Sequence, residues 1–302
     1  MNHFCTITTQ SHLYKVHALA DSLKEQKHDF SLHVLVVDTN QSFVYPNCIF
    51  YSLQDLSTNT TTKIILSKYR KNSNKLRWSL KPVFLLQLLE KPDTVKVIYL
   101  DNDLSFHSDY TFLFNLLDKH SFLLTPHHYK HDPQKNQNWL EANFRVGLYN
   151  AGFIGVNKDA TDSLNWWADC CAYRCEKNSL RGTFDDQKYL DLIPVIQDGA
   201  HIIKHKGCNV AGWNMEICRR EQHNGITTIN GVFPIVFIHY NSMTIREIVK
   251  GNDNLLFPFY EKYFSVLKKH KPELKNTDLF AEESLIDNIK LSIWEMITNA
   301  GF

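Results

Sequence analysis

Short apolar runs recur along the chain, and between them apolar residues are spaced three or four positions apart. Short runs rich in apolar and β-branched side chains are typical of strands. Two runs, 32–37 and 95–100, are almost continuously apolar, as expected for strands that are buried on both faces of a sheet. The pattern predicts strands at 3–8, 32–37, 48–51, 95–100, 122–125 and 149–156.

The segments between these runs have helical periodicity. Ser11 is a predicted N-cap for a first helix, and Pro82 suits the first turn of another. The predicted helices are 11–23, 80–89, 157–175, 257–270 and 277–298. Strands that alternate with helices predict an α/β fold with a Rossmann-like, mainly parallel and doubly wound sheet. We expect one domain at 1–250, followed at 251–302 by a C-terminal helical extension packed on it.

Composition narrows the class of protein. The 302 residues are 43% hydrophobic and carry 33 basic against 32 acidic side chains, a formal net charge of +1. This balance argues against a nucleic-acid-binding protein, which is normally basic. The seven cysteines are odd in number, and the first residues run directly into a predicted strand, so we expect a reduced, cytoplasmic protein. No apolar run approaches the ~20 residues of a membrane span.

One cysteine pair has a spacing that metal sites also use. Cys171 and Cys175 lie four positions apart in a predicted helix, but no second pair accompanies them. A structural zinc site normally needs four ligands, so we do not expect zinc there.

Polar residues follow several predicted strands directly. Asp101 and Asp103 come after the apolar run 95–100, and Thr8 and Asp38 follow two other strands. In doubly wound sheets, ligands bind at the carboxyl ends of the strands. Two carboxylates one residue apart form a hard oxygen site suited to Mg²⁺ or Mn²⁺. The alternative is a loop with two solvated acids, but the buried strand before the pair favours the metal site.

A basic stretch precedes this acidic pair. Between Asp55 and Glu90 there is no acidic residue, and seven basic residues lie in the interval. Such a stretch attracts a diphosphate or an anionic lipid surface, although a solvated face or a mobile loop is the simpler interpretation for its outer residues. Lys81 differs because it starts the helix that leads into the strand 95–100, so it could reach the same cleft.

Five short motifs together resemble a known family. The strand end at 97–103 looks like the Asp-x-Asp motif of GT-A nucleotide-sugar glycosyltransferases. Asn150-Ala-Gly and Asp186-Gln187 are similar to motifs of the retaining family 8 enzymes and their bacterial relatives. The segment 207–214 resembles a motif of bacterial surface-polysaccharide transferases, and Phe237-Ile-His239 looks like the late strand that carries a metal-binding histidine. These similarities follow the family's order from Thr6 to His239.

The resemblance implies a role for each matching residue. Asp101, Asp103 and His239 would hold Mn²⁺ or Mg²⁺, which would bridge the two phosphates of a nucleotide diphosphate sugar. The remaining implied donor-site residues would contact the base and ribose (Thr6, Thr8, Asp38), bind elsewhere on the donor (Lys81, Asn102) or surround the transferred sugar (Asn150, Asp186, Gln187). The expected donor is a UDP-hexose and the expected acceptor is a glycan or glycolipid of a bacterial surface.

The same resemblance implies that sugar transfer retains the anomeric configuration. Gln187 would lie near the anomeric carbon, and a neutral amide is a poor covalent nucleophile. Same-face attack is therefore the simpler route, with Asp186 as the alternative covalent candidate. One motif departs from the family pattern: the closing segment after His239 lacks its usual glycine and lysine, and Arg246 is a hypothetical replacement for that charge.

Other interpretations stay open from the sequence. A haloacid dehalogenase-type phosphohydrolase would use Asp101 as nucleophile, although its motif normally follows the first strand. A catalytically inactive sugar-nucleotide-binding protein is a second alternative. Trp213 and Asn214 could pack in the core or form an acceptor platform, and 126–147 suits a flexible acceptor-side loop. The C-terminal helices could support a homo-oligomer or a peripheral contact with the inner face of the cell membrane.

Overall fold

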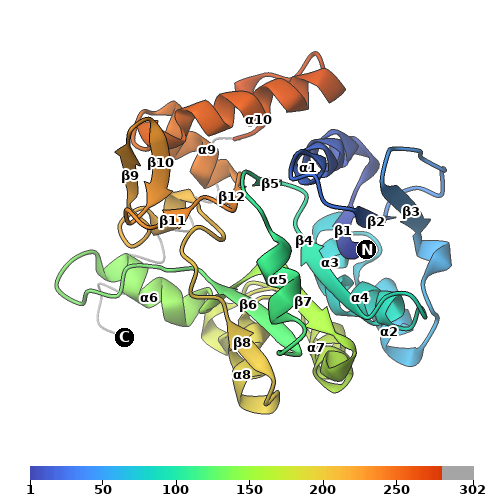
Figure 1. Ribbon diagram of the computed structural model, residues 1–302. Coiled ribbons are helices and arrows are strands. Elements are labelled where there is room, and N and C mark those ends of the chain that lie inside the picture. Colours follow the sequence, from blue (N-terminus) through green and yellow to red (C-terminus); the bar gives the residue numbers. More distant parts are fainter. Residues whose placement is uncertain (281–302) are drawn as a thin grey trace.

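The protein is built around a mixed sheet with helices on both faces (Figure 1). The structure is a computed structural model and describes residues 1–280. Four of the six strand pairings in this sheet are parallel, and only β7 runs antiparallel to its neighbours. The strand order is β3 (Cys48–Ser52), β2 (Phe30–Val36), β1 (Asn2–Thr8), β4 (Lys96–Leu100), β7 (Tyr149–Asn157), β6 (Phe122–Pro126) and β8 (Ala200–Ile202).

Alternating side chains of the central strands fill two separate cores. In β1, Phe4 points into the core beneath α1 (Leu13–Glu25) and α5 (Thr111–Leu116). Its neighbour Cys5 points to the opposite core. That second core is covered by α2 (Thr60–Tyr69), α3 (Ser73–Ser79), α4 (Lys81–Leu89) and α7 (Thr161–Tyr173). Burial on both faces explains why these strands are continuously apolar in sequence.

Two smaller sheets and two helices from the end of the described segment form a third core. The strand β5 (Leu104–Phe106) pairs antiparallel with β12 (Phe237–His239), so a late segment returns to the end of β4. The other small sheet consists of β9 (Arg220–His223), β10 (Ile226–Ile229) and β11 (Phe233–Pro234). Figure 1 shows it beside α9 (Ser242–Val249) and α10 (Phe257–His270), and side chains of these elements pack together.

The main sequence predictions of the fold are confirmed. All six predicted strands are present, within a residue or two of their predicted ends. The predicted helix 80–89 is α4, and 257–270 is α10. The helix predicted at 157–175 is a short 3-10 turn followed by α7. The α/β class with a mainly parallel sheet is therefore correct.

Some local predictions need correction. Ser11 does not cap α1 but lies inside a 3-10 turn (Gln10–His12), and no side chain caps that helix. The basic stretch is not a loop, because it forms α2 and α3. The side chains of Asn59 and Asn72 cap the N-termini of these two helices. The expected flexible loop at 126–147 contains α6 (Gln137–Arg145).

The C-terminal predictions are tested only in part. Most of the second C-terminal helix, predicted at 277–298, lies outside the described residues. The domain boundary at 250 stays a prediction, and so does an oligomer contact through the C-terminal helices. Among residues 1–280, every helix is too short or too polar to cross a membrane.

Candidate metal and donor site

Three predicted metal ligands meet at the carboxyl end of β4. Asp101 directly follows this strand, and its backbone N–H donates to Gly152 O at 2.8 Å. The pairing of β12 with β5 sets His239 opposite Leu104, one residue after Asp103. The ligand atoms of Asp101, Asp103 and His239 all lie within 4.8 Å of one another. Among the described residues, this is the one cluster of three such side chains with metal-ligand geometry.

Neighbouring groups orient the Asp101 carboxylate. Its Oδ1 accepts a hydrogen bond from the Tyr99 hydroxyl at 2.8 Å and lies 3.4 Å from Lys81 Nζ. The other oxygen, Oδ2, faces Gly152: a Cβ on that glycine would lie 2.9 Å from Oδ2 and 2.6 Å from His239 Cε1. A glycine is therefore needed here, because any side chain would fill the space between two of the ligands.

The imidazole of His239 is held from both sides. Nε2 lies 3.2 Å from Asp103 Oδ1, and Nδ1 lies 3.3 Å from Asn209 Oδ1. A proton on Nδ1 would donate to Asn209 and leave the Nε2 lone pair for a cation. Burial is the largest single effect and lowers the pKa of His239, but the carboxylates of Asp103 and Asp101 together outweigh it, so the net pKa is raised. Burial opposes ionisation of Asp103, yet the nearby imidazole holds the pKa of this carboxyl below its usual value.

This donor set fits a hard divalent cation. Two carboxylates and one imidazole supply oxygen and nitrogen ligands of the kind that Mn²⁺ accepts, and carboxylates suit Mg²⁺ as well. The space kept open by Gly152 is the observation that supports the fit.

Lys81 connects this cluster to Asp186. Its ammonium is buried, lies 3.2 Å from Asp186 Oδ2 and donates to Ala151 O at 3.0 Å. Burial disfavours the charge, but the carboxylates of Asp101 and Asp186 raise the pKa of Lys81 overall. Burial also raises the pKa of Asp186 to about 6, with Lys81 opposing the shift. The charge of Lys81 thus partly neutralises Asp101 and Asp186.

The side-chain amides of Asn150 and Gln187 form hydrogen bonds to the backbone in and just before β7. Gln187 Oε1 accepts from Ala151 N at 3.1 Å, and its Nε2 donates to Val146 O at 3.3 Å. Asn150 Oδ1 accepts from Gly152 N at 2.8 Å, and its Nδ2 lies 3.2 Å from His127 Nε2. Gln187 is followed by a 3-10 helix, Lys188–Leu192, which leads into α8 (Ile193–Ile196).

The predicted base and ribose contacts occupy neighbouring strand ends. Asn102 Nδ2 donates to Thr8 Oγ1 at 2.9 Å, which ties β1 to the metal-site turn. Asp38 borders a cavity of about 480 Å³ that Arg70 also lines. Thr6 and Thr8 are fully buried in this conformation, and the Thr6 hydroxyl has no hydrogen-bond partner. The roles assigned to these residues stay predictions.

Sequence reasoning gave no role to three residues that shape this site. Tyr99 orients Asp101, Gly152 leaves space between the ligands, and Asn209 holds His239. Gly152 and Asn209 lie inside motifs that the sequence had singled out. The Tyr99 hydroxyl had no sequence signal, since tyrosine is common in buried strands. Arg246 lies half-buried on α9, and its role near a diphosphate stays a prediction.

Similar proteins are found by sequence and by structure. The chain is 29% identical over 253 residues to the uncharacterized protein YfnD of Bacillus subtilis (strain 168), covering 80% of this chain and 78% of that protein. A galactosyltransferase, LgtC, solved with donor and acceptor sugar analogues, is 15% identical with a TM-score of 0.45, over 79% of this chain and 86% of that one. Mouse xyloside xylosyltransferase 1 is 17% identical with a TM-score of 0.46, over 80% and 98% of the two chains. No protein-family model matches the chain.

Proposed function

We propose that this protein is a metal-dependent glycosyltransferase that uses a nucleotide diphosphate sugar as donor. The observation that carries the proposal is the convergence of Asp101, Asp103 and His239 at the carboxyl end of β4, around the space kept open by Gly152. The order of the sequence motifs supports the same class of enzyme. In this proposal the donor is a UDP-hexose, and the acceptor is a hydroxyl of a bacterial surface glycan or glycolipid.

A bound divalent cation would act as a Lewis acid on the donor diphosphate. The protein's own groups explain why donor binding should need the metal. Asp101 and Asp103 present negative charge, which repels a diphosphate. Lys81 is committed to Asp101 and Asp186, so it offsets this repulsion only in part. We assign Arg246 to contact the diphosphate, in place of the lysine that the segment after His239 lacks.

Retention of configuration is part of the proposal. The amide of Gln187 bonds to the backbone at Ala151 and Val146, which suits a residue that fixes the sugar-facing strand. Asp186 is only 2% exposed and is paired with Lys81, so as it stands it is poorly placed to attack a sugar. Both observations favour same-face attack over a covalent intermediate. Analysis of the product's anomeric configuration by NMR tests retention directly.

A thermal-shift screen tests the proposed donor class. Nucleoside diphosphates and their sugars are added with Mn²⁺ or with EDTA. We expect stabilisation by one base in the presence of Mn²⁺ only, because ligands that bind the folded state raise the melting temperature. The Asp103→Ala variant should lose this shift. The absence of a shift with every nucleotide, or an equal shift in the Asp103→Ala variant, would contradict the proposal.

The phosphohydrolase alternative is less well supported. The Asp-x-Asp motif follows β4 and not the first strand, and His239 adds a nitrogen ligand to the pair. Release of phosphate from small phosphoesters in the absence of a nucleotide sugar would favour that alternative. Donor hydrolysis with Mn²⁺ would exclude an inactive binding protein.

A further inference from the structure

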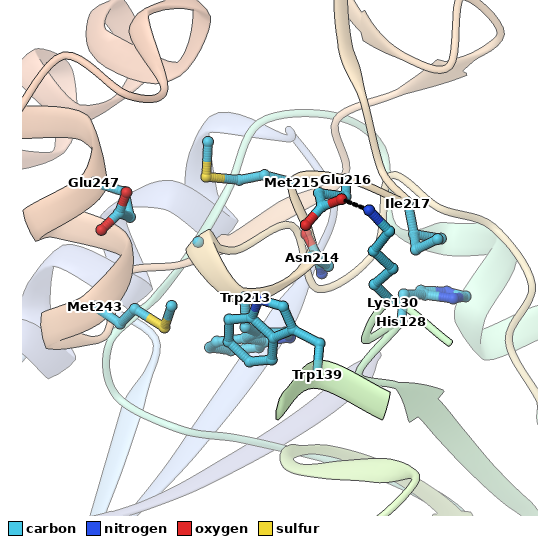
Figure 2. A pocket seen from close by; sticks show the side chains of 11 residues that line it. His128, Lys130, Trp139, Trp213, Asn214, Met215, Glu216, Ile217, Met243 and Glu247 are labelled. Carbon is cyan, nitrogen blue, oxygen red and sulfur yellow. Dashed lines mark hydrogen bonds and ion pairs between the residues drawn. The ribbon is translucent and has the colours of Figure 1, made fainter. Parts of the chain in front are cut away.

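A second cavity lies next to the metal cluster. It has a volume of about 280 Å³, and its lining includes two tryptophans, two methionines and three charged side chains. Figure 2 shows these around the opening: Trp139, Trp213, Met215, Met243, Lys130, Glu216 and Glu247. They come from the segment 130–139, which runs into α6, from the segment 213–216 and from α9, so the cavity forms only where three separate segments meet.

Contacts with neighbouring groups hold the walls of this cavity in place. The Trp213 indole N–H donates to His127 O at 3.0 Å, and 7% of this residue is exposed. Trp139 stacks on Tyr129 with ring centroids 5.2 Å apart, so one ring face is covered and only the other can receive a ligand. Gly212 permits the close approach of α9, because a Cβ there would lie 3.0 Å from Thr244 Cα.

Trp213 is shared between the cavity and the metal cluster. Its ring meets that of His239 edge to face, with centroids 5.3 Å apart and an interplanar angle of 78°. One side chain thus separates the cavity from the proposed metal ligand. A molecule in the cavity would lie beside a donor sugar that is held at the cluster.

The charges of the lining disfavour an anionic ligand. Lys130 forms an ion pair with Glu216, so its charge is already engaged. Burial lowers the pKa of His128 to about 4, which leaves this imidazole neutral at pH 7. Glu247 adds a carboxylate whose Oε2 accepts from Asn252 at 2.7 Å. The lining therefore offers aromatic faces and carboxylate acceptors but no cation that is free to pair with a phosphate.

We infer that this cavity is the acceptor subsite and that it binds a neutral sugar ring. The inference rests on the proposed glycosyltransferase function. The C–H face of a pyranose packs on an indole, while its hydroxyls donate to carboxylates, and aromatic walls with few polar groups are typical of ligand sites. Trp139 and Trp213 supply the aromatic faces, and Glu216 and Glu247 supply the acceptors.

Saturation-transfer difference NMR tests this subsite without donor or metal. The probes are the methyl glycosides of galactose, glucose and N-acetylglucosamine, with glucose 6-phosphate and glucuronic acid as charged counterparts. At least one neutral glycoside should receive saturation from the protein's aromatic protons, and it should bind more tightly than the charged sugars. The Trp139→Ala variant should bind it about tenfold more weakly. Trp166→Ala is the matched control, since Trp166 is also half-buried but lies on α7, and this variant should bind normally.

Three results would overturn the inference: no neutral glycoside binds, glucose 6-phosphate binds as tightly as the neutral glycosides, or Trp139→Ala binds like the wild type. If circular dichroism shows that Trp139→Ala is unfolded, Glu247→Gln decides, because it keeps the volume and removes a charged acceptor. Unchanged binding in that variant would then contradict the inference. If the proposed donor class is wrong, the nucleotide screen with Mn²⁺ shows this separately. The two proposals can therefore fail independently.

Discussion

Gly152→Ala tests the metal site with one methyl group. The new Cβ would lie 2.6 Å from His239 Cε1 and 2.9 Å from Asp101 Oδ2. Non-bonded carbon atoms pack at about 3.5–4.0 Å, so the histidine ring must move by roughly 1 Å. Metal-ligand distances tolerate only about 0.2 Å. We therefore expect Mn²⁺ affinity to fall at least as much as on loss of an outer-shell partner, about 10–100-fold.

The cost to folding should be smaller than the cost to metal binding. Overpacking of a core position destabilises by about 1–3 kcal/mol, and each kcal/mol lowers the melting temperature by roughly 2–4 °C in a protein of this size class. Gly155→Ala is the matched control on the same strand. Its Cβ would lie 3.0 Å from Leu123 Cδ1 and 3.1 Å from Leu123 Cβ, and its three nearest neighbours include none of the proposed ligands. Both variants should therefore fold with similar losses of stability.

Electron paramagnetic resonance of Mn²⁺ measures the binding, because bound Mn²⁺ no longer contributes to the free-ion signal. The wild type and Gly155→Ala should bind alike, and Gly152→Ala should bind far more weakly. If Gly152→Ala folds and binds Mn²⁺ with wild-type affinity, the cation does not lie between Asp101 and His239, and the assignment is refuted.

Three other substitutions probe the surroundings of the cluster. Lys81→Met leaves Asp186 buried without its cation, and breaking a buried pair costs about 3–5 kcal/mol. The pKa of Asp186 is raised to about 6 in the folded protein, so its protonation stabilises the fold at low pH, and this stabilisation is lost as the pH rises through 6. The unfolding free energy of the Lys81→Met variant should therefore fall more at pH 8 than at pH 5. Asn209→Gly keeps the backbone φ of 61° but frees the His239 ring, so Mn²⁺ affinity should fall about 10–100-fold, as measured by calorimetry. Arg246→Ala should raise the donor KM, and an unchanged KM would dismiss its role at the diphosphate.

The strands were predictable because burial on both faces leaves a strong sequence signal. In β1 and β4, consecutive apolar residues fill the two cores in turn. The helices of the basic stretch gave a weaker signal, because α2 and α3 bury only two residues each and their apolar stripes are narrow. The antiparallel direction of β7 had no local signal, since a strand's direction depends on its connections.

The candidate site was predictable where function restricts residue type. Asp101, Asp103 and His239 lie together as the motifs implied. The residues around the ligands were harder to predict, because the hydrogen bond of Asn209 and the space at Gly152 exist only after distant segments meet. The aromatic cavity arises in the same way, from three segments that are separate in the sequence, although its tryptophans are conspicuous there.

The central claim is that the Asp101–Asp103–His239 cluster binds a nucleoside diphosphate through a divalent cation. Calorimetric titration of the nucleoside diphosphate selected by the screen tests it, with the wild type and Asp103→Ala in Mn²⁺ or EDTA. The wild type should bind in Mn²⁺ only. Equal binding in EDTA, or by the folded Asp103→Ala variant, would contradict it.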